Sequence, residues 1–140
     1  MLVLDANILI RAVLGVRVRT LLAKYGAVEF FAPNTAYEEA REHLPKILKK
    51  RGIAPQAALA LLDSLAEVVQ PVDRDTYESF EDAARRRLSA RDLDDWPVLA
   101  TALALGCPIW TEDRDFFGTG VATWTTDRVE LFLKETEPAG

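Results

Sequence analysis

Short apolar runs alternate with stretches of helical periodicity along the 140 residues, and this alternation constrains the fold most strongly. The apolar runs are expected to be buried strands, at residues 2–4, 28–32, 68–72, 108–111 and 121–125. Strands that are separated by helices pair in parallel, and the helices then cover both faces of the sheet. The sequence therefore predicts an α/β fold: a three-layer α/β/α sandwich around a mainly parallel sheet of about five strands.

Glycine and proline mark the ends of the expected helices. These helices are expected at about residues 8–25, 34–51, 55–66, 73–88, 92–105 and 126–134. Gly26, Gly52 and Gly106 stand where a helix-ending glycine is expected, and Pro55 suits a first turn. We expect a single domain over residues 1–134 and a flexible tail over 135–140, because 140 residues suit one core.

Composition excludes several classes of protein. Hydrophobic residues make up 49% and charged residues 28%, as in ordinary globular proteins. The chain has no run of 18 apolar residues and no basic segment before its first apolar run, so we expect a cytoplasmic protein. One cysteine, Cys107, excludes an internal disulfide and a thiolate-rich metal site, and one histidine, His43, leaves little for histidine-based catalysis.

Acidic residues are concentrated in the second half of the chain. The net charge is −5, and residues 92–115 alone hold six acids and a single base, Arg114. Acidity this local predicts a functional site. It also argues against a simple basic surface for DNA, because neutralising phosphates requires a positive face.

Four segments can deliver acids to one edge of the predicted sheet. Asp5 follows the first expected strand, and Asp113 follows the fourth. Glu39 lies early in the helix after the second strand, and Asp94 and Asp95 open the helix before the fourth. Ligands of parallel sheets bind beyond the carboxyl ends of the strands, where the strand order reverses. We therefore expect these carboxylates to meet there.

A cluster of carboxylates is stabilised by a bound cation. Neighbouring carboxylates repel one another, and some must take up protons unless a cation neutralises them. Ligands that are all oxygen select hard ions such as Mg²⁺ or Mn²⁺. Such ions activate water and stabilise the attacking and leaving oxygens when a phosphodiester is cleaved. The acids therefore predict metal-dependent hydrolysis of a nucleic-acid backbone.

Three stretches of the chain carry recognisable motifs: Asp5-Ala6-Asn7, FFAPNTAYEEA at 30–40, and LDDWPVLATALALGCPIWTEDRDFF at 93–117. In order and spacing they resemble the PIN domain, the nuclease fold of VapC-type toxins. The resemblance spans nearly the whole chain and implies a five-stranded parallel sandwich. It further implies an endoribonuclease that depends on Mg²⁺ or Mn²⁺, an RNA substrate, a cognate antitoxin and a homodimer.

The family pattern also implies which acids are catalytic and bind metal: Asp5, Glu39, Asp95 and Asp113. Glu38 and Glu39 are adjacent, so only one of them faces the site, and the spacing from the strand favours Glu39. Asp95 lies four residues before Leu99, above the buried stripe of its helix. Asp92 or Asp94 is expected to start that helix, and Asp94 is expected to serve as its cap.

Other residues have two interpretations each. Asp115 is either a further metal ligand or a turn residue paired with Arg114. Asn7 and Thr111 either hydrogen-bond to ligand carboxylates or serve local caps and turns. Arg11, in the first helix, is expected to bind substrate. The arginines at 85–87 and 91 either contact RNA phosphates or form a solvated helix face.

Two other functions compete with the nuclease. One is a catalytically silent PIN-like module that binds RNA or protein, and the complete acidic set argues against it. The other is phosphoryl transfer through an aspartate nucleophile, which needs a second aspartate where this chain has Asn7. No glycine-rich phosphate loop is present either. The number of metal ions, one or two, stays open.

Overall fold

The computed structural model describes residues 1–89 and 91–136 of the chain. Within these residues lies a five-stranded sheet in the order β3-β2-β1-β4-β5, and neighbouring strands are parallel. The strands are β1 (Leu2–Leu4), β2 (Phe30–Pro33), β3 (Val69–Val72), β4 (Ile109–Trp110) and β5 (Thr123–Trp124). The predicted parallel α/β architecture is confirmed.

The strands are shorter than the apolar runs that predict them. The N–H of Val28 donates to the carbonyl of Tyr25 at 3.0 Å, and the N–H of Val68 donates to that of Leu65 at 2.9 Å. Both bonds close turns that follow a helix, so β2 and β3 begin later than expected. β4 and β5 contain two residues each.

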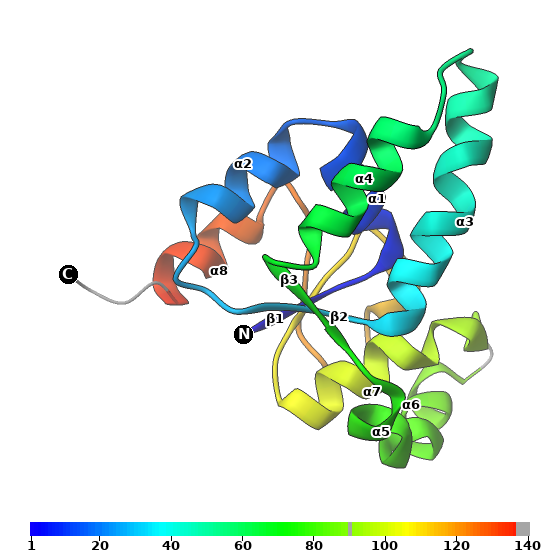
Figure 1. Ribbon diagram of the computed structural model, residues 1–140. Coiled ribbons are helices and arrows are strands. Elements are labelled where there is room, and N and C mark those ends of the chain that lie inside the picture. Colours follow the sequence, from blue (N-terminus) through cyan, green and yellow to red (C-terminus); the bar gives the residue numbers. More distant parts are fainter. Residues whose placement is uncertain (90, 137–140) are drawn as a thin grey trace.

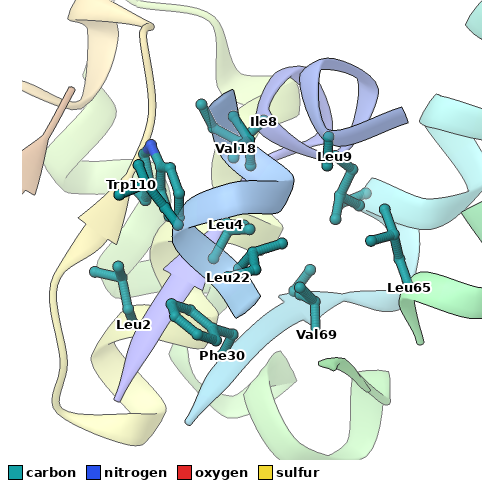
Figure 2. Packing of buried hydrophobic residues seen from close by; sticks show 14 of the residues in the cluster. Leu2, Leu4, Ile8, Leu9, Val18, Leu22, Phe30, Leu65, Val69 and Trp110 are labelled. Carbon is teal, nitrogen blue, oxygen red and sulfur yellow. The ribbon is translucent and has the colours of Figure 1, made fainter. Parts of the chain in front are cut away.

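One face of the sheet is covered by α1 (Ala6–Leu14), α2 (Arg17–Lys24), α3 (Asn34–Lys50), α4 (Gln56–Leu65) and α8 (Val129–Thr136) (Figure 1). Leu2 and Leu4 of β1 point into this layer, where Phe30 and Trp110 of the neighbouring strands join them (Figure 2). Because alternate residues of a strand point to opposite faces, Val3 points the other way.

The opposite face is covered by α5 (Arg74–Tyr77), α6 (Glu81–Leu88) and α7 (Trp96–Leu105) (Figure 1). The single helix expected at 73–88 is divided by a 3₁₀ turn, η1 (Glu78–Phe80). Just before this turn, Tyr77 is fully buried, and its hydroxyl donates to Asn34 Oδ1 at 2.7 Å. Tyr77 thus connects the end of α5 to the start of α3.

The last helix begins and ends later than expected. The N–H groups of Arg128 and Val129 donate to the carbonyl of Thr125, which forms a turn before α8. The helix continues through Thr136, so the first two residues of the expected tail are helical, and residues 137–140 lie outside the described residues. No helix in the described part of the chain is long and apolar enough to cross a membrane.

The strand order reverses between β1 and β4. From β1 the chain moves outward through β2 and β3, and it later returns to the other side of β1 to form β4 and β5. Leu4 pairs with Trp110 at the carboxyl ends of the two central strands. The next residues, Asp5 and Thr111, therefore emerge side by side at this switch point.

Candidate metal centre

A small acidic cavity opens at the carboxyl edge of the sheet, beside the switch point. Its volume is about 30 Å³, enough for one or two water-sized species. Its walls come from separate segments of the chain and consist of Asp5, Ala6, Asn7, Glu39, Asp95, Val98 and Asp113. Four of these residues are acids and none is basic, so the cavity concentrates negative charge.

Both carboxylate oxygens of Asp5 accept hydrogen bonds. Asp5 is the N-cap of α1, and its Oδ1 accepts a bond from the N–H of Ile8 at 3.0 Å. Its Oδ2 accepts a bond from the hydroxyl of Thr111. The Thr111 oxygen in turn accepts a bond from the N–H of Asp113 at 2.9 Å. Thr111 thus connects the two strand-end aspartates and fixes the orientation of Asp5.

The buried position of Asp5 opposes its ionisation. Asp5 is 6% exposed, and this burial raises the pKa of its carboxyl from 3.8 to about 6. The hydrogen bonds from Thr111 and Ile8 work against the increase, and the negative charges of Asp113 and Glu39 add to it. A positive charge in the cavity would reverse this balance.

Asp95 enters the cavity because another residue makes the local cap. The Asp92 side chain accepts a bond from the N–H of Asp94 at 3.0 Å and caps the 3₁₀ turn η2 (Leu93–Asp95). The expected capping role of Asp94 is therefore wrong, and Asp94 is exposed. Asp95 precedes α7 without a side-chain capping bond, and its buried Oδ2 has no hydrogen-bond partner among the described residues. Burial, followed by the charge of Asp113, raises the pKa of Asp95.

Asp115 stands close to Asp95 and Asp113. One carboxylate oxygen from each of the three lies within 4.8 Å of the others. The 3₁₀ turn η3 (Arg114–Phe116) produces this proximity, since the N–H of Asp115 donates to Asp113 Oδ1 at 2.9 Å. Within the described ranges Asp115 forms no ion pair with Arg114, so its side chain is available to the acidic group.

Glu39, rather than Glu38, lines the cavity. Both residues are exposed on α3, and the side chain of Glu39 is 59% exposed, so it forms the rim of the site. Its Oε1 lies 3.8 Å from Nε2 of His43, one helical turn further along. The acids that line the cavity thus span two environments, from buried Asp5 to the solvated rim at Glu39.

The remaining residues expected at the site are placed differently from one another. Asn7 lines the cavity but forms no side-chain hydrogen bond in the described part of the chain. Arg11 lies outside the cavity and lines a separate pocket of about 630 Å³. Asp5, Glu39, Asp95 and Asp113 are therefore brought together, whereas the residue expected to bind substrate faces a neighbouring space.

Arginines near the end of α6 have a structural role that sequence reasoning missed. Arg91 donates to the carbonyls of Asp115 and Phe117, at 2.9 and 2.6 Å, and Arg87 donates to that of Thr119 at 2.9 Å. Arg85 donates to Glu81 at 2.8 Å. Arg87 and Arg91 thus hold the loop that follows Asp113. The glycines of this loop at 118 and 120 are a weak sequence signal for such close approach.

The donor set fits a hard divalent cation. Every polar side chain of the acidic group presents oxygen, which is the donor that Mg²⁺ and Mn²⁺ prefer. The unpartnered Oδ2 of Asp95 is a buried acceptor that such an ion would satisfy. The raised pKa values of Asp5 and Asp95 also indicate uncompensated negative charge. Asp5, Asp95, Asp113 and Asp115, with Glu39 at the rim, could hold the ion.

Comparisons with known proteins place this geometry in context. The sequence model of one protein family, described as PIN domain, matches residues 3–134. A solved structure of FitAB bound to an IR36 DNA fragment is 21% identical, covers 90% of this chain and 95% of that chain, and has a TM-score of 0.64. A crystal structure of FitAcB from Neisseria gonorrhoeae is 19% identical, covers 90% and 98%, and has a TM-score of 0.60. No curated protein matches the chain. The structural similarities show a shared fold.

Proposed function

The chain belongs to the PIN domain family, and from this premise we propose that it is an endoribonuclease that hydrolyses RNA phosphodiester bonds with Mg²⁺ or Mn²⁺. One observation carries the proposal: acids from four segments of the chain converge on a cavity whose walls include no basic residue. A structural ion pair would have a basic partner there. A domain that only bound RNA would have no use for this repulsion.

The chain's own residues would bind and orient the reacting groups. Asp5, Asp95, Asp113 and Asp115, with Glu39 at the rim, would hold the cation. Thr111 would keep Asp5 in position through its hydroxyl. When bound, the cation would activate water and neutralise charge that develops on the phosphate. The cavity walls hold no serine, cysteine, lysine or histidine, and Asn7 stands where an aspartate nucleophile would need a second aspartate. Water is therefore the expected nucleophile.

Cleavage of a mixed single-stranded RNA, in Mn²⁺, Mg²⁺ or EDTA, tests this function. We expect cleavage with either ion, none in EDTA, and a loss of about 100-fold or more in Asp95→Asn. Asp94→Asn is the matched control, because Asp94 is adjacent and exposed. Cleavage that persists in EDTA, or an Asp95→Asn protein as active as wild type, would overturn the proposal.

We further propose that the chain is the toxin of a toxin–antitoxin pair and forms a homodimer. The resemblance to VapC-type toxins supports both, and the similar FitAB structure is an assembly with DNA. A groove of about 410 Å³, with the exposed Val68 in its wall, is a candidate contact surface for an antitoxin. Expression of the wild-type protein in cells should arrest their growth, and expression of Asp95→Asn should not. Light scattering of the purified protein should give twice the mass of one chain.

A further inference from the structure

A second pocket adjoins the acidic cavity at the same edge of the sheet. It has a volume of about 630 Å³ and is formed by α1, the start of α2, and the loops that follow β4 and β5. Its walls consist of Arg11, Arg17, Glu112, Arg114, Phe117, Thr125, Thr126 and Asp127. The catalytic proposal uses none of these side chains.

The acids of this pocket are engaged in building its walls. Glu112 accepts a bond from the N–H of Thr126 at 2.7 Å, and Asp127 accepts one from the hydroxyl of Thr125. Both bonds lie within the loops after β4 and β5. Both carboxylates are thus held in place by hydrogen-bond donors of the protein itself.

Two arginines of the pocket, Arg11 and Arg114, are not paired with an acid that the structure describes. Arg17 lies 3.4 Å from Glu130, whereas Arg11 and Arg114 form no ion pair in the described part of the chain. Both Arg11 and Arg114 are exposed. Guanidinium groups that are free and solvent-accessible are suited to phosphate, which they bind through two parallel hydrogen bonds.

Phe117 adds an aromatic surface to the same pocket. It is 42% exposed, although a phenylalanine gains free energy from burial. Its backbone is fixed, because its carbonyl accepts the bond from Arg91 at 2.6 Å. An exposed aromatic side chain beside free arginines is the combination on which single-stranded nucleic acids bind, with bases stacked on the ring and phosphates on the cations.

The pocket and the acidic cavity are connected through the chain. Arg114 directly follows Asp113, and Arg11 lies four residues after Asn7, about 6 Å further along α1. Neighbouring residues of α1 and of the loop after β4 thus line the two spaces, which places the pocket next to the acidic cavity.

We propose that this pocket binds a nucleotide of single-stranded RNA adjacent to the scissile phosphate, with its base stacked on Phe117 and its phosphate held by Arg11 and Arg114. The inference rests on the proposed function for the identity of its ligand. It assigns Phe117 and Arg114 to substrate binding, and it gives Arg11 the role expected from the sequence. A protein segment in the same pocket is the alternative occupant.

Binding of a fluorescent single-stranded oligoribonucleotide in EDTA tests the pocket separately from catalysis. Phe117→Leu should weaken binding about 5- to 100-fold, and Phe117→Trp should retain it, because stacking requires an aromatic ring. Arg114→Gln and Arg11→Gln should each reduce the dependence of log affinity on log salt by about 0.7. Phe80→Leu and Lys134→Gln, which alter exposed residues of η1 and α8, are matched controls and should bind as wild type.

The outcomes separate this inference from the nuclease proposal. Loss of binding in Phe117→Leu alone supports the pocket, even if no RNA is cleaved with any metal. Equal affinities for Phe117→Leu, Phe117→Trp and Phe80→Leu would overturn it, and so would a wild-type protein that does not bind RNA. If the wild-type protein does not bind RNA, a protein segment becomes the expected occupant of the pocket. If the enzyme is active, Phe117→Leu should raise KM and leave kcat nearly unchanged.

Discussion

At the scale of single residues, Asp5 serves the fold and the site together. As a helix cap it accepts the N–H of Ile8, and as a wall of the cavity it accepts the hydroxyl of Thr111. A cap alone would be satisfied by asparagine or serine. A buried carboxylate raises the free energy of the folded state, which asparagine or serine would not do. The choice of aspartate is therefore explained by a function of its negative charge, such as binding a cation.

Thr111→Val removes the hydroxyl that donates to Asp5 and keeps the shape of the side chain. Because Asp5 Oδ2 would stay buried without that donor, we expect the free energy of unfolding to fall by about 1–3 kcal/mol. RNA cleavage should fall with it, since Asp5 loses its fixed orientation. Urea denaturation and a cleavage assay measure the two effects.

Thr111→Ser is the control for this change, because it restores the hydroxyl and removes only a methyl group. It should recover most of the activity. If Thr111→Val cleaves RNA as fast as Thr111→Ser, the hydroxyl does not orient Asp5 for catalysis.

At the scale of elements, the loop after β4 depends on α6 and the residues that follow it. Arg91 donates to two carbonyls of this loop, and the loop carries Asp115 and Phe117. An arginine run on a helix has the same sequence pattern whether it faces solvent or a neighbouring loop. Only the packing of α6 against the loop distinguishes the two roles.

Arg91→Ala should loosen the loop and disturb the site more than the fold. Arg91 is exposed, so we expect the midpoint of thermal unfolding to change little, while kcat for RNA cleavage falls about 3- to 10-fold. Differential scanning fluorimetry and steady-state kinetics measure these quantities. Arg86→Ala, at an exposed position of the preceding helix α6, should match wild type in kcat. An equal loss of kcat in both variants would contradict the bracing role of Arg91.

Glu130 joins α8 to α2. It accepts bonds from the hydroxyl of Tyr25 at 2.6 Å and from Lys24 at 3.0 Å, and these bonds hold its pKa at about 2, below the usual 4.5. A carboxyl with a lowered pKa in the folded state stabilises that state above its unfolded pKa, and this stability is lost as the pH falls through the folded value.

Glu130→Gln should therefore destabilise the protein at pH 6, and the difference from wild type should shrink between about pH 4.5 and pH 2. Thermal unfolding followed by circular dichroism across this range measures the difference. Glu135→Gln, an exposed residue of the same helix, should show no such dependence. A difference that stays constant down to pH 2 would mean that the charge of Glu130 does not stabilise the α2–α8 contact.

At the scale of the whole molecule, topology explains what the sequence could predict about the site. Asp5 and Asp113 were predictable because Asp5 directly follows an apolar strand, Asp113 comes three residues after Trp110 at the end of another, and parallel strands end at one edge. The pocket beside them was not predictable, because Arg114, Phe117 and Thr125 come from loops whose paths depend on tertiary contacts. Loop geometry leaves no periodic signal in the sequence.

For acids on helices, the sequence predicted only in part which residue faces the cavity. Adjacent residues point about 100° apart, so a small shift in where the helix starts changes which of them faces the site. The spacing favoured Glu39 over Glu38, and Glu39 does line the cavity. The capping role expected of Asp94 fell to Asp92, because a 3₁₀ turn precedes α7 and shifts the start of the helix. The regular stretches of this fold are thus predictable from periodicity, and the irregular turns are not.

The burial of Asp5 among other acids gives the protein a pH dependence that a cation should reverse. The pKa of Asp5 is raised in the folded state, so the metal-free protein binds more protons folded than unfolded between about pH 4 and pH 6. Its stability should therefore fall as the pH rises through this window. The difference between 3.8 and about 6 corresponds to about 3 kcal/mol.

Adding Mn²⁺ at pH 7.5 should restore this stability, because the ion binds the ionised carboxylates of the folded state alone. At a Mn²⁺ concentration 100 times the Kd, mass action contributes about 2.7 kcal/mol, or roughly 5–10 °C in the unfolding midpoint. Scanning calorimetry at pH 5 and 7.5, with and without Mn²⁺, measures both effects. Asp95→Asn should be more stable than wild type without metal and should respond little to Mn²⁺, whereas Asp94→Asn should behave as wild type. Of the two residues, Asp95 lines the cavity and Asp94 does not. An equal change of the unfolding midpoint with Mn²⁺ in both variants would therefore show that the ion binds elsewhere.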